Sequence, residues 1–174
     1  MRVLVVYYSR TGVTKKLALK LSKKFNGDLC EITCPRYTLG VFSYFKAGYD
    51  SVTHRLPAIT TSENIYHDYD LVLIGSPIWT SYPALPIRSF LDSQPALPKN
   101  IGLFFSYGGH SLPEKAISHI EKTLGRPVTG ALAIQNKIVR QDAYDNQLNN
   151  YVRKLKDQAK NTNTRSSTVP SVIN

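Results

Sequence analysis

The sequence has little cysteine, few acidic side chains and no long hydrophobic run. Its only cysteines are Cys30 and Cys34, too few for a disulfide framework or a four-ligand zinc site. No apolar stretch approaches the roughly 20 residues that a membrane-spanning helix needs. The residues after Met1 also lack the pattern of a secretion signal. We therefore expect a cytoplasmic protein with no membrane span and no metal site.

Acidic residues are scarce relative to basic ones. The chain has 12 Asp and Glu against 22 Lys and Arg, which gives a formal net charge of +10. Every charged residue before Asp28 is basic. Such an excess attracts anionic ligands and partners, and nucleic acid is one of the possibilities. For most of the lysines in residues 15–24, however, we favour a solvated helix face.

The composition is that of a folded domain, with 42% hydrophobic and 20% charged residues among 174. A chain of this length forms one domain and buries roughly 70% of the surface that it exposes when unfolded. Residues 161–174 are mostly polar and have little to bury. We therefore expect a domain over residues 1–160, followed by a flexible polar tail over residues 161–174.

Strand-like and helix-like segments alternate along this domain. The expected strands are 3–8, 28–33, 70–75, 100–107 and 128–134. The expected helices are 14–25, 83–92, a third one ending at 124 with a capping box of Ser111 and Glu114, and 143–160. Residues 37–59 are ambiguous and fit a helix flanked by loops. Strands joined by helix-length connections predict an α/β fold with a parallel sheet.

A loop rich in hydroxyl groups, Ser9-Arg10-Thr11-Gly12-Val13-Thr14, follows the first strand. Ligands of open parallel sheets bind beyond the carboxyl ends of the strands. The free N–H groups at a helix start attract anions there. The loop lacks the glycine patterns of nucleoside triphosphatases and of dinucleotide-binding proteins. It therefore predicts a phosphate monoester site, with an ordinary Ser or Thr helix cap as the alternative.

Two further loops are expected at the same edge of the sheet. Gly75-Ser76-Pro77-Ile78-Trp79 ends the third strand, and Phe105-Ser106-Tyr107-Gly108-Gly109 ends the fourth. With the first loop, in this order, they make residues 2–160 resemble the flavodoxin family. The resemblance implies a flavodoxin-like three-layer sandwich with helices on both faces of a five-stranded parallel sheet in the order 2-1-3-4-5. It also implies flavin mononucleotide (FMN), bound without a covalent bond at the carboxyl edge.

The resemblance further implies which residues bind FMN, and it implies no catalytic side chain. The candidates are Ser9, Arg10, Thr11, Gly12, Val13 and Thr14 for the phosphate, then Pro77, Ile78, Trp79, Thr80, Ser81 and Tyr82, with Ser106, Tyr107, Gly108, Gly109 and His110, for the ring. Trp79, Tyr82 and Tyr107 offer stacking surfaces, although a place in the core is the alternative for Trp79 and Tyr107. For His110, a bond to the flavin edge and a plain exposed position both stay open.

The resemblance favours an FMN-dependent electron carrier that serves redox partner proteins with acidic docking surfaces. An NAD(P)H-dependent FMN reductase acting on a quinone or similar small acceptor is the alternative. A nucleic-acid-binding module is supported by the net charge alone. A phosphoreceiver domain shares the strand order but needs acidic residues where Tyr8-Ser9 and Gly75-Ser76 stand. Because reduced FMN is anionic, we expect basic surroundings to make its potential less negative than in acidic flavodoxins.

Overall fold

The computed structural model describes residues 1–37, 56–61, 66–109 and 112–166, with side chains as far as residue 160. Most of the ambiguous segment 37–59 therefore lies outside the described residues, as do His110 and Ser111. The elements are β1 (Val3–Tyr7), α1 (Val13–Phe25), β2 (Asp28–Glu31), η1 (Pro35–Tyr37), β3 (Leu71–Trp79), β4 (Tyr82–Pro83), α3 (Leu85–Asp92), β5 (Asn100–Tyr107), α4 (Pro113–Leu124), β6 (Gly130–Gln135), α5 (Asn136–Arg140) and α6 (Asp145–Ser166).

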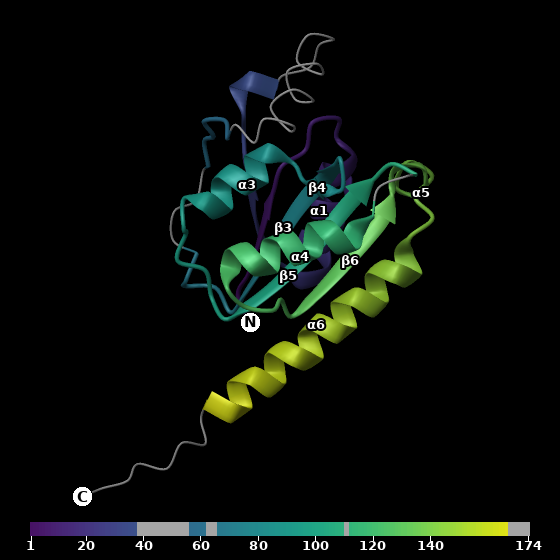
Figure 1. The fold of residues 1–174 in the computed structure, drawn as a ribbon. Helices are drawn as coiled ribbons and strands as arrows, with labels where there is room; N and C mark the ends of the chain where they lie inside the picture. Colours follow the sequence, from purple (N-terminus) through teal and green to yellow (C-terminus); the bar gives the residue numbers. More distant parts are fainter. Residues whose placement is uncertain (38–55, 62–65, 110–111, 167–174) are drawn as a thin grey trace, which may run out of the picture.

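The strands form one sheet in the order β2-β1-β3-β5-β6, and neighbours along this path run parallel. This confirms the predicted five-stranded order and the α/β sandwich. The two-residue strand β4 pairs antiparallel with the end of β3 and was not expected. Figure 1 shows α3 and α4 in front of the sheet and α1 behind it. None of the described helices combines the length and apolar character needed to cross a membrane.

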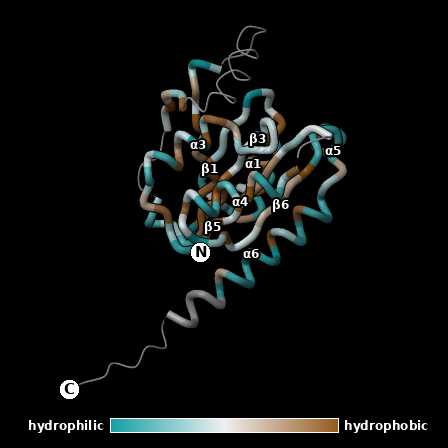
Figure 2. Tube along the Cα trace, in the orientation of Figure 1, coloured by the Kyte–Doolittle hydropathy of each residue, from teal (hydrophilic) through white to brown (hydrophobic). Residues whose placement is uncertain are grey.

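Two hydrophobic cores lie on opposite faces of the sheet. Alternate residues of β1 serve different cores: Leu4 and Val6 face α3 and α4, whereas Val3 and Val5 face α1 and α6. This two-sided burial explains why the strand is an unbroken apolar run rather than an alternating one. Hydrophobic residues accordingly gather along the strands in Figure 2, and hydrophilic ones along the outer helices.

The expected end of the third strand and the expected start of the helix that follows the fourth strand were wrong. β3 continues to Trp79 rather than ending at Gly75, because it stays paired with β5 as far as Pro77 opposite Ser106. The expected N-cap was Ser111, but the N-cap of α4 is Leu112, which makes no side-chain capping bond. Pro113 then takes the first helical position, where its missing N–H is no loss.

The remaining differences lie in the C-terminal third of the chain. The short helix α5 follows β6 directly and was not expected. α6 continues to Ser166, so the first six residues of the expected 161–174 tail are helical. The rest of that segment lies outside the described residues, and its flexibility stays a prediction.

The basic face of α1 is partly neutralised within the chain. Lys15 pairs with Glu31 at 2.8 Å, and Lys20 pairs with Asp142 at 2.9 Å and with Asp145 at 3.0 Å. The hydrogen bond from Lys20, followed by one from Lys16, holds the pKa of Asp142 below its usual range. Exposed pairs of this kind contribute little stability each. They nevertheless tie α1 to β2 and to the start of α6.

Gly75 is the position where the sheet tolerates a side chain least. A Cβ atom there would lie 2.0 Å from Cζ of the buried Phe104 ring on β5. We predict that Gly75→Ala lowers the free energy of unfolding by about 2–3 kcal/mol, because overpacking a dense core forces strain on its neighbours. Urea unfolding measures this, with Gly108→Ala as the control, since a Cβ at Gly108 meets nothing within 4 Å. Equal unfolding midpoints for the two variants would contradict the packing argument.

Candidate functional site

The loop between β1 and α1 presents an open helix N-terminus. Gly12 is the N-cap of α1, with φ of 81°, and no side chain makes a capping bond there. A Cβ at Gly12 would meet nothing within 4 Å, so the space above the loop is open. The first N–H groups of a helix have no partner within it. The ordinary capping alternative is thereby removed, and the first turn of α1 is free to bind an anion.

Hydroxyl groups surround this helix start. The Ser9 Oγ atom is buried and has no hydrogen-bond partner among the described residues. Thr14 and Ser106 are only 1% and 2% exposed, and their hydroxyl oxygens lie 2.8 Å apart. A hydroxyl donates one hydrogen bond and accepts two. Since one hydroxyl of the pair donates to the other, one hydrogen remains for a ligand.

The second expected loop is a β-hairpin. Trp79 on β3 pairs with Tyr82 on β4, and Thr80 and Ser81 form the turn between them. Both turn residues have positive φ, 48° and 68°, as a type I′ turn requires. Such turns normally use Asn and Gly, because other residues are strained at positive φ. The hairpin tip therefore holds a strained backbone beside the expected ring site.

The aromatic residues of this hairpin have different surroundings. Trp79 is half-buried and meets Tyr8 and Tyr37 edge to face, with ring centroids 5.9 and 5.6 Å apart. It therefore combines partial core packing with a position at the sheet edge. Tyr82 is 40% exposed and contacts the ring of His119 on α4. Of the two, Tyr82 offers the more accessible stacking surface.

The third expected segment completes the edge at the end of β5. Ser106 and Tyr107 are its last residues, and Gly108 and Gly109 follow as exposed backbone. The fifth residue predicted for this segment, His110, lies outside the described residues. A Cβ at either glycine would meet nothing within 4 Å, so neither is required by packing. Their role against a ligand stays a prediction.

The three segments meet at one edge of the sheet. The backbone N–H of Tyr8, directly after β1, donates to the carbonyl of Gly75 within β3, 3.1 Å away. Pro77 stands opposite Ser106, and Ser106 reaches Thr14 as described above. The structure thus brings together the residues predicted from 9–14, 77–82 and 106–109. That these residues contact FMN stays a prediction.

A cavity that the sequence did not indicate lies beside the first loop. Its volume is about 550 Å³, and its lining residues are Tyr8, Ser9, Arg10, Glu31, Ile32, Thr33, Cys34, Pro35 and Tyr37. Burial raises the pKa of the Tyr8 hydroxyl well above its usual range, so Tyr8 stays protonated at neutral pH. Glu31 Oε2 accepts hydrogen bonds from Tyr7 Oη and Lys15 Nζ, at 3.0 and 2.8 Å.

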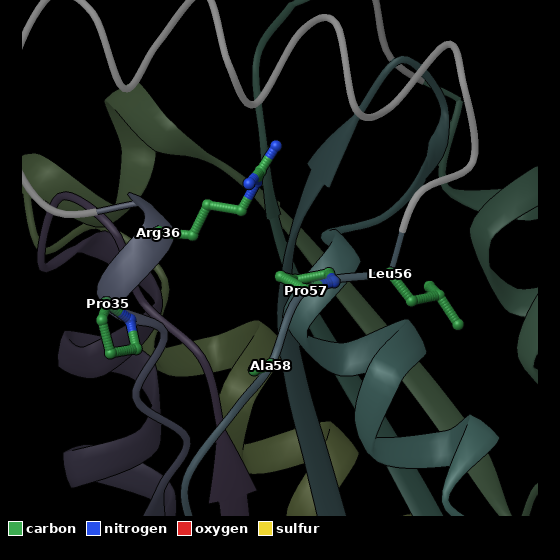
Figure 3. A pocket seen from close by; sticks show the side chains of 5 residues that line it. All are labelled: Pro35, Arg36, Leu56, Pro57 and Ala58. Atoms are coloured by element: carbon green, nitrogen blue, oxygen red, sulfur yellow. The ribbon is translucent and has the colours of Figure 1, made fainter.

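A smaller cavity of about 360 Å³ adjoins this one and shares Pro35 with it. Figure 3 shows Arg36 extending from η1 toward the segment that carries Pro57 and Ala58, whereas Leu56 points away. The two segments are joined by the pairing of Thr33 with Thr60. No periodic pattern marks η1 in the sequence, which is why neither cavity was expected.

Comparison with known proteins identifies the family. A model of the flavodoxin family matches residues 2–155. The fold resembles a flavoprotein in complex with FMN from Lactobacillus acidophilus NCFM, 28% identical, with a TM-score of 0.67 over 80% of this chain and 97% of that one. The apo-form of the flavoprotein from the same organism is 30% identical, with a TM-score of 0.61 over 76% and 91% of the two chains.

A third structure, two-electron reduced flavodoxin from Megasphaera elsdenii, is 19% identical, with a TM-score of 0.50 over 90% and 97% of the two chains. At that identity it supports the fold alone. No curated protein matches the chain. The sheet order and the converging loops define a flavodoxin-like α/β protein. The chain belongs to the flavodoxin family, because the family model covers nearly its whole length.

The strained hairpin tip yields a prediction about stability. We expect replacement of Thr80 by Asn together with Ser81 by Gly to raise the free energy of unfolding by about 1–2 kcal/mol, since both new residues accept positive φ. Urea unfolding of the flavin-free chain tests this. Thr80 Oγ1 donates to the Trp79 carbonyl at 2.8 Å. A less stable double variant would show that this bond outweighs the backbone strain.

Proposed function

We propose that this chain is an FMN-dependent electron carrier that exchanges electrons with redox partner proteins. The supporting observation is the convergence of an uncapped helix start, a strained hairpin and an exposed Gly-Gly segment at one sheet edge. Membership of the flavodoxin family points to FMN as the cofactor. When bound, FMN supplies a ring that accepts and releases electrons, and the protein positions it.

The residues at the first loop fit a phosphate monoester. The free N–H groups of α1, the unpartnered Ser9 hydroxyl and the Thr14–Ser106 pair are all neutral donors. The positive end of the helix dipole adds a favourable field. Half-buried Arg10 is the nearest cation in the loop sequence. Ser9 to Thr14 would therefore hold the phosphate mainly through neutral hydrogen bonds.

The hairpin and the Gly-Gly segment would flank the ring. Tyr82 and Tyr107 present partly exposed aromatic surfaces, and Trp79 backs the hairpin from the sheet side. Gly108 and Gly109 leave backbone groups accessible to the polar edge of a ring. The titratable side chains of residues 77–82 and 106–109 are tyrosines. These residues would therefore bind and orient the FMN ring, and we assign no proton transfer to them.

The basic residues around this edge support partner proteins with acidic docking surfaces. Arg10 and exposed Arg36 lie beside the sheet edge, with the cavities described above. Lys23 and Lys24, by contrast, occupy the last turn of α1 at its far end. An acidic partner that approaches the ring would therefore meet the arginines first. Because several α1 lysines are paired within the chain, a nucleic-acid-binding face gains no support.

Binding of FMN through its phosphate can be tested by comparing FMN with riboflavin. We expect the flavin-free chain to bind FMN much more tightly than riboflavin, which lacks the phosphate. Ser106→Ala should weaken FMN binding about 5–10-fold, as expected for one lost hydrogen bond of about 1–1.4 kcal/mol, and leave riboflavin binding nearly unchanged. Fluorescence titration measures both affinities.

The matched control is Ser89→Ala on α3, whose hydroxyl donates to the Pro57 carbonyl away from the loops. It should leave both affinities unchanged. Equal affinity of the chain for FMN and riboflavin would contradict the phosphate site. An equal loss for both ligands in Ser106→Ala would show that Ser106 supports the whole edge rather than the phosphate loop.

The reductase alternative is favoured by one observation, the 550 Å³ cavity, which is large enough for a small acceptor. We predict that the FMN-loaded chain alone does not oxidise NADH or NADPH in the presence of a quinone. Adding a flavodoxin reductase should start the reaction, because a carrier receives electrons from another protein. Absorbance of the nicotinamide measures the rate. Turnover without the added reductase would contradict the electron-carrier proposal and support the reductase alternative.

A further inference from the structure

The cavity beside the first loop is lined by none of the residues predicted to hold the FMN ring. It opens where β1 and β2 end, and β1 separates β2 from β3 in the sheet. The hairpin and the Gly-Gly segment, by contrast, continue β3 and β5. The cavity volume of about 550 Å³ lies in the range of small-molecule sites. Only Ser9 and Arg10 line it and also belong to the expected phosphate loop.

The hydroxyl of Tyr8 is a buried polar group at this cavity. The side chain is 4% exposed, and its hydroxyl has no hydrogen-bond partner among the described residues. A buried hydroxyl without a partner is destabilising, so such groups normally bond to protein, water or ligand. The Ser9 hydroxyl, on the next residue, is buried and unpartnered in the same sense. Because the Ser9 hydroxyl is assigned above to the FMN phosphate, the Tyr8 hydroxyl is the donor left for a second ligand.

The other lining residues determine which kind of ligand the Tyr8 hydroxyl can bind. Ile32, Cys34, Pro35 and Tyr37 contribute mainly apolar surface. The charged residues of the lining, Arg10 and Glu31, have opposite signs. Glu31 is already bonded to Tyr7 and Lys15, so its charge is compensated. The compensated Glu31 does not attract a cation, and the mainly apolar walls favour an uncharged ligand.

We propose that this cavity binds a flat, uncharged ring that carries a carbonyl oxygen. The oxygen accepts a hydrogen bond from the Tyr8 hydroxyl, and the ring packs against Tyr37, Pro35 and Ile32. A carbonyl oxygen is an acceptor without a hydrogen of its own, which matches a hydroxyl donor. The site is separate from the FMN site, so both ligands bind at once.

The position of Trp79 relates this site to the proposed cofactor. Tyr8 and Tyr37, which both line the cavity, both contact the Trp79 ring. A ligand against either tyrosine is thus one side chain away from Trp79. On the proposed function, Trp79 belongs to the hairpin beside the FMN ring, so the cavity would hold a small redox molecule near the cofactor. Only this link rests on the proposed function; binding in the cavity does not.

The test uses tetramethyl-1,4-benzoquinone as the probe. It is flat and uncharged, it carries carbonyl oxygens, and its full substitution prevents addition of the Cys34 thiol to the ring. Equilibrium dialysis is carried out on the full chain, both flavin-free and loaded with oxidised FMN. We expect saturable binding at one site, with dissociation constants within about threefold of each other in the two forms.

Tyr8→Phe should weaken probe binding about 5–10-fold, since it removes one hydrogen bond and keeps the ring. Tyr144→Phe is the control, because Tyr144 is equally buried but belongs to the core beneath α1 and α6. Trp79 is the chain's one tryptophan. Its emission in the flavin-free chain should therefore be quenched over the same probe concentrations as the binding, and this quenching should need about 5–10-fold more probe in Tyr8→Phe.

Three results would overturn the proposal: no saturable binding, unchanged affinity in Tyr8→Phe, or displacement of the probe by FMN. Displacement would show that the cavity is part of the flavin site. Thermal unfolding of each variant identifies a fold defect, and Pro35→Ala, which removes part of the proposed ring contact, then serves as a second test. A chain that fails to bind FMN would contradict the proposed function, and the flavin-free titration would still decide this inference.

Discussion

The parallel register of the three central strands is the constraint on which the site depends. Tyr7 stands beside Gly75, Gly75 beside Phe104, and Phe104 beside Leu132. This row crosses the sheet where β1 ends, and β3, β5 and β6 continue three or four residues beyond it. It leaves no room for a side chain at Gly75, whose Cβ would enter the Phe104 ring. Tight packing inside the sheet thus sets where the loops outside it meet.

The main architecture was predictable because the buried strands are short apolar runs bounded by turn residues. Residues 3–8 and 70–75 carry this pattern, and helix-length connections between such runs indicate parallel pairing. The end of β3 was not predictable in the same way. Gly75-Ser76-Pro77 resembles a chain break, but Ser76 Oγ accepts the Ala84 N–H at 2.9 Å and the Pro77 carbonyl accepts it at 3.0 Å. The backbone there continues as strand because distant partners satisfy its polar groups.

The hairpin and the cavity were also not predictable from the local sequence. A type I′ turn is normally recognised by Asn and Gly, and Thr80-Ser81 contains neither. The cavity depends on how η1 packs beside the β1 loop, which is tertiary information. Tyr8 directly precedes the predicted loop, so its proximity to the site could have been predicted from the sequence. Its place at the end of an apolar run made it indistinguishable from a core residue, and the structure adds that it lines the cavity.

The net charge of the chain overstates the positive electrostatic field at the proposed site, because several basic side chains are paired with acidic ones or lie far from the site. Lys15, Lys16 and Lys20 all have acidic partners within 3.4 Å. The last-turn lysines of α1 lie at the other end of that helix. Arg10 is the basic residue of the first loop, and it also lines the cavity beside that loop. An effect of basic charge on the potential of bound FMN would therefore come from the few basic residues at this edge, such as Arg10 and Arg36, rather than from the net charge of the chain.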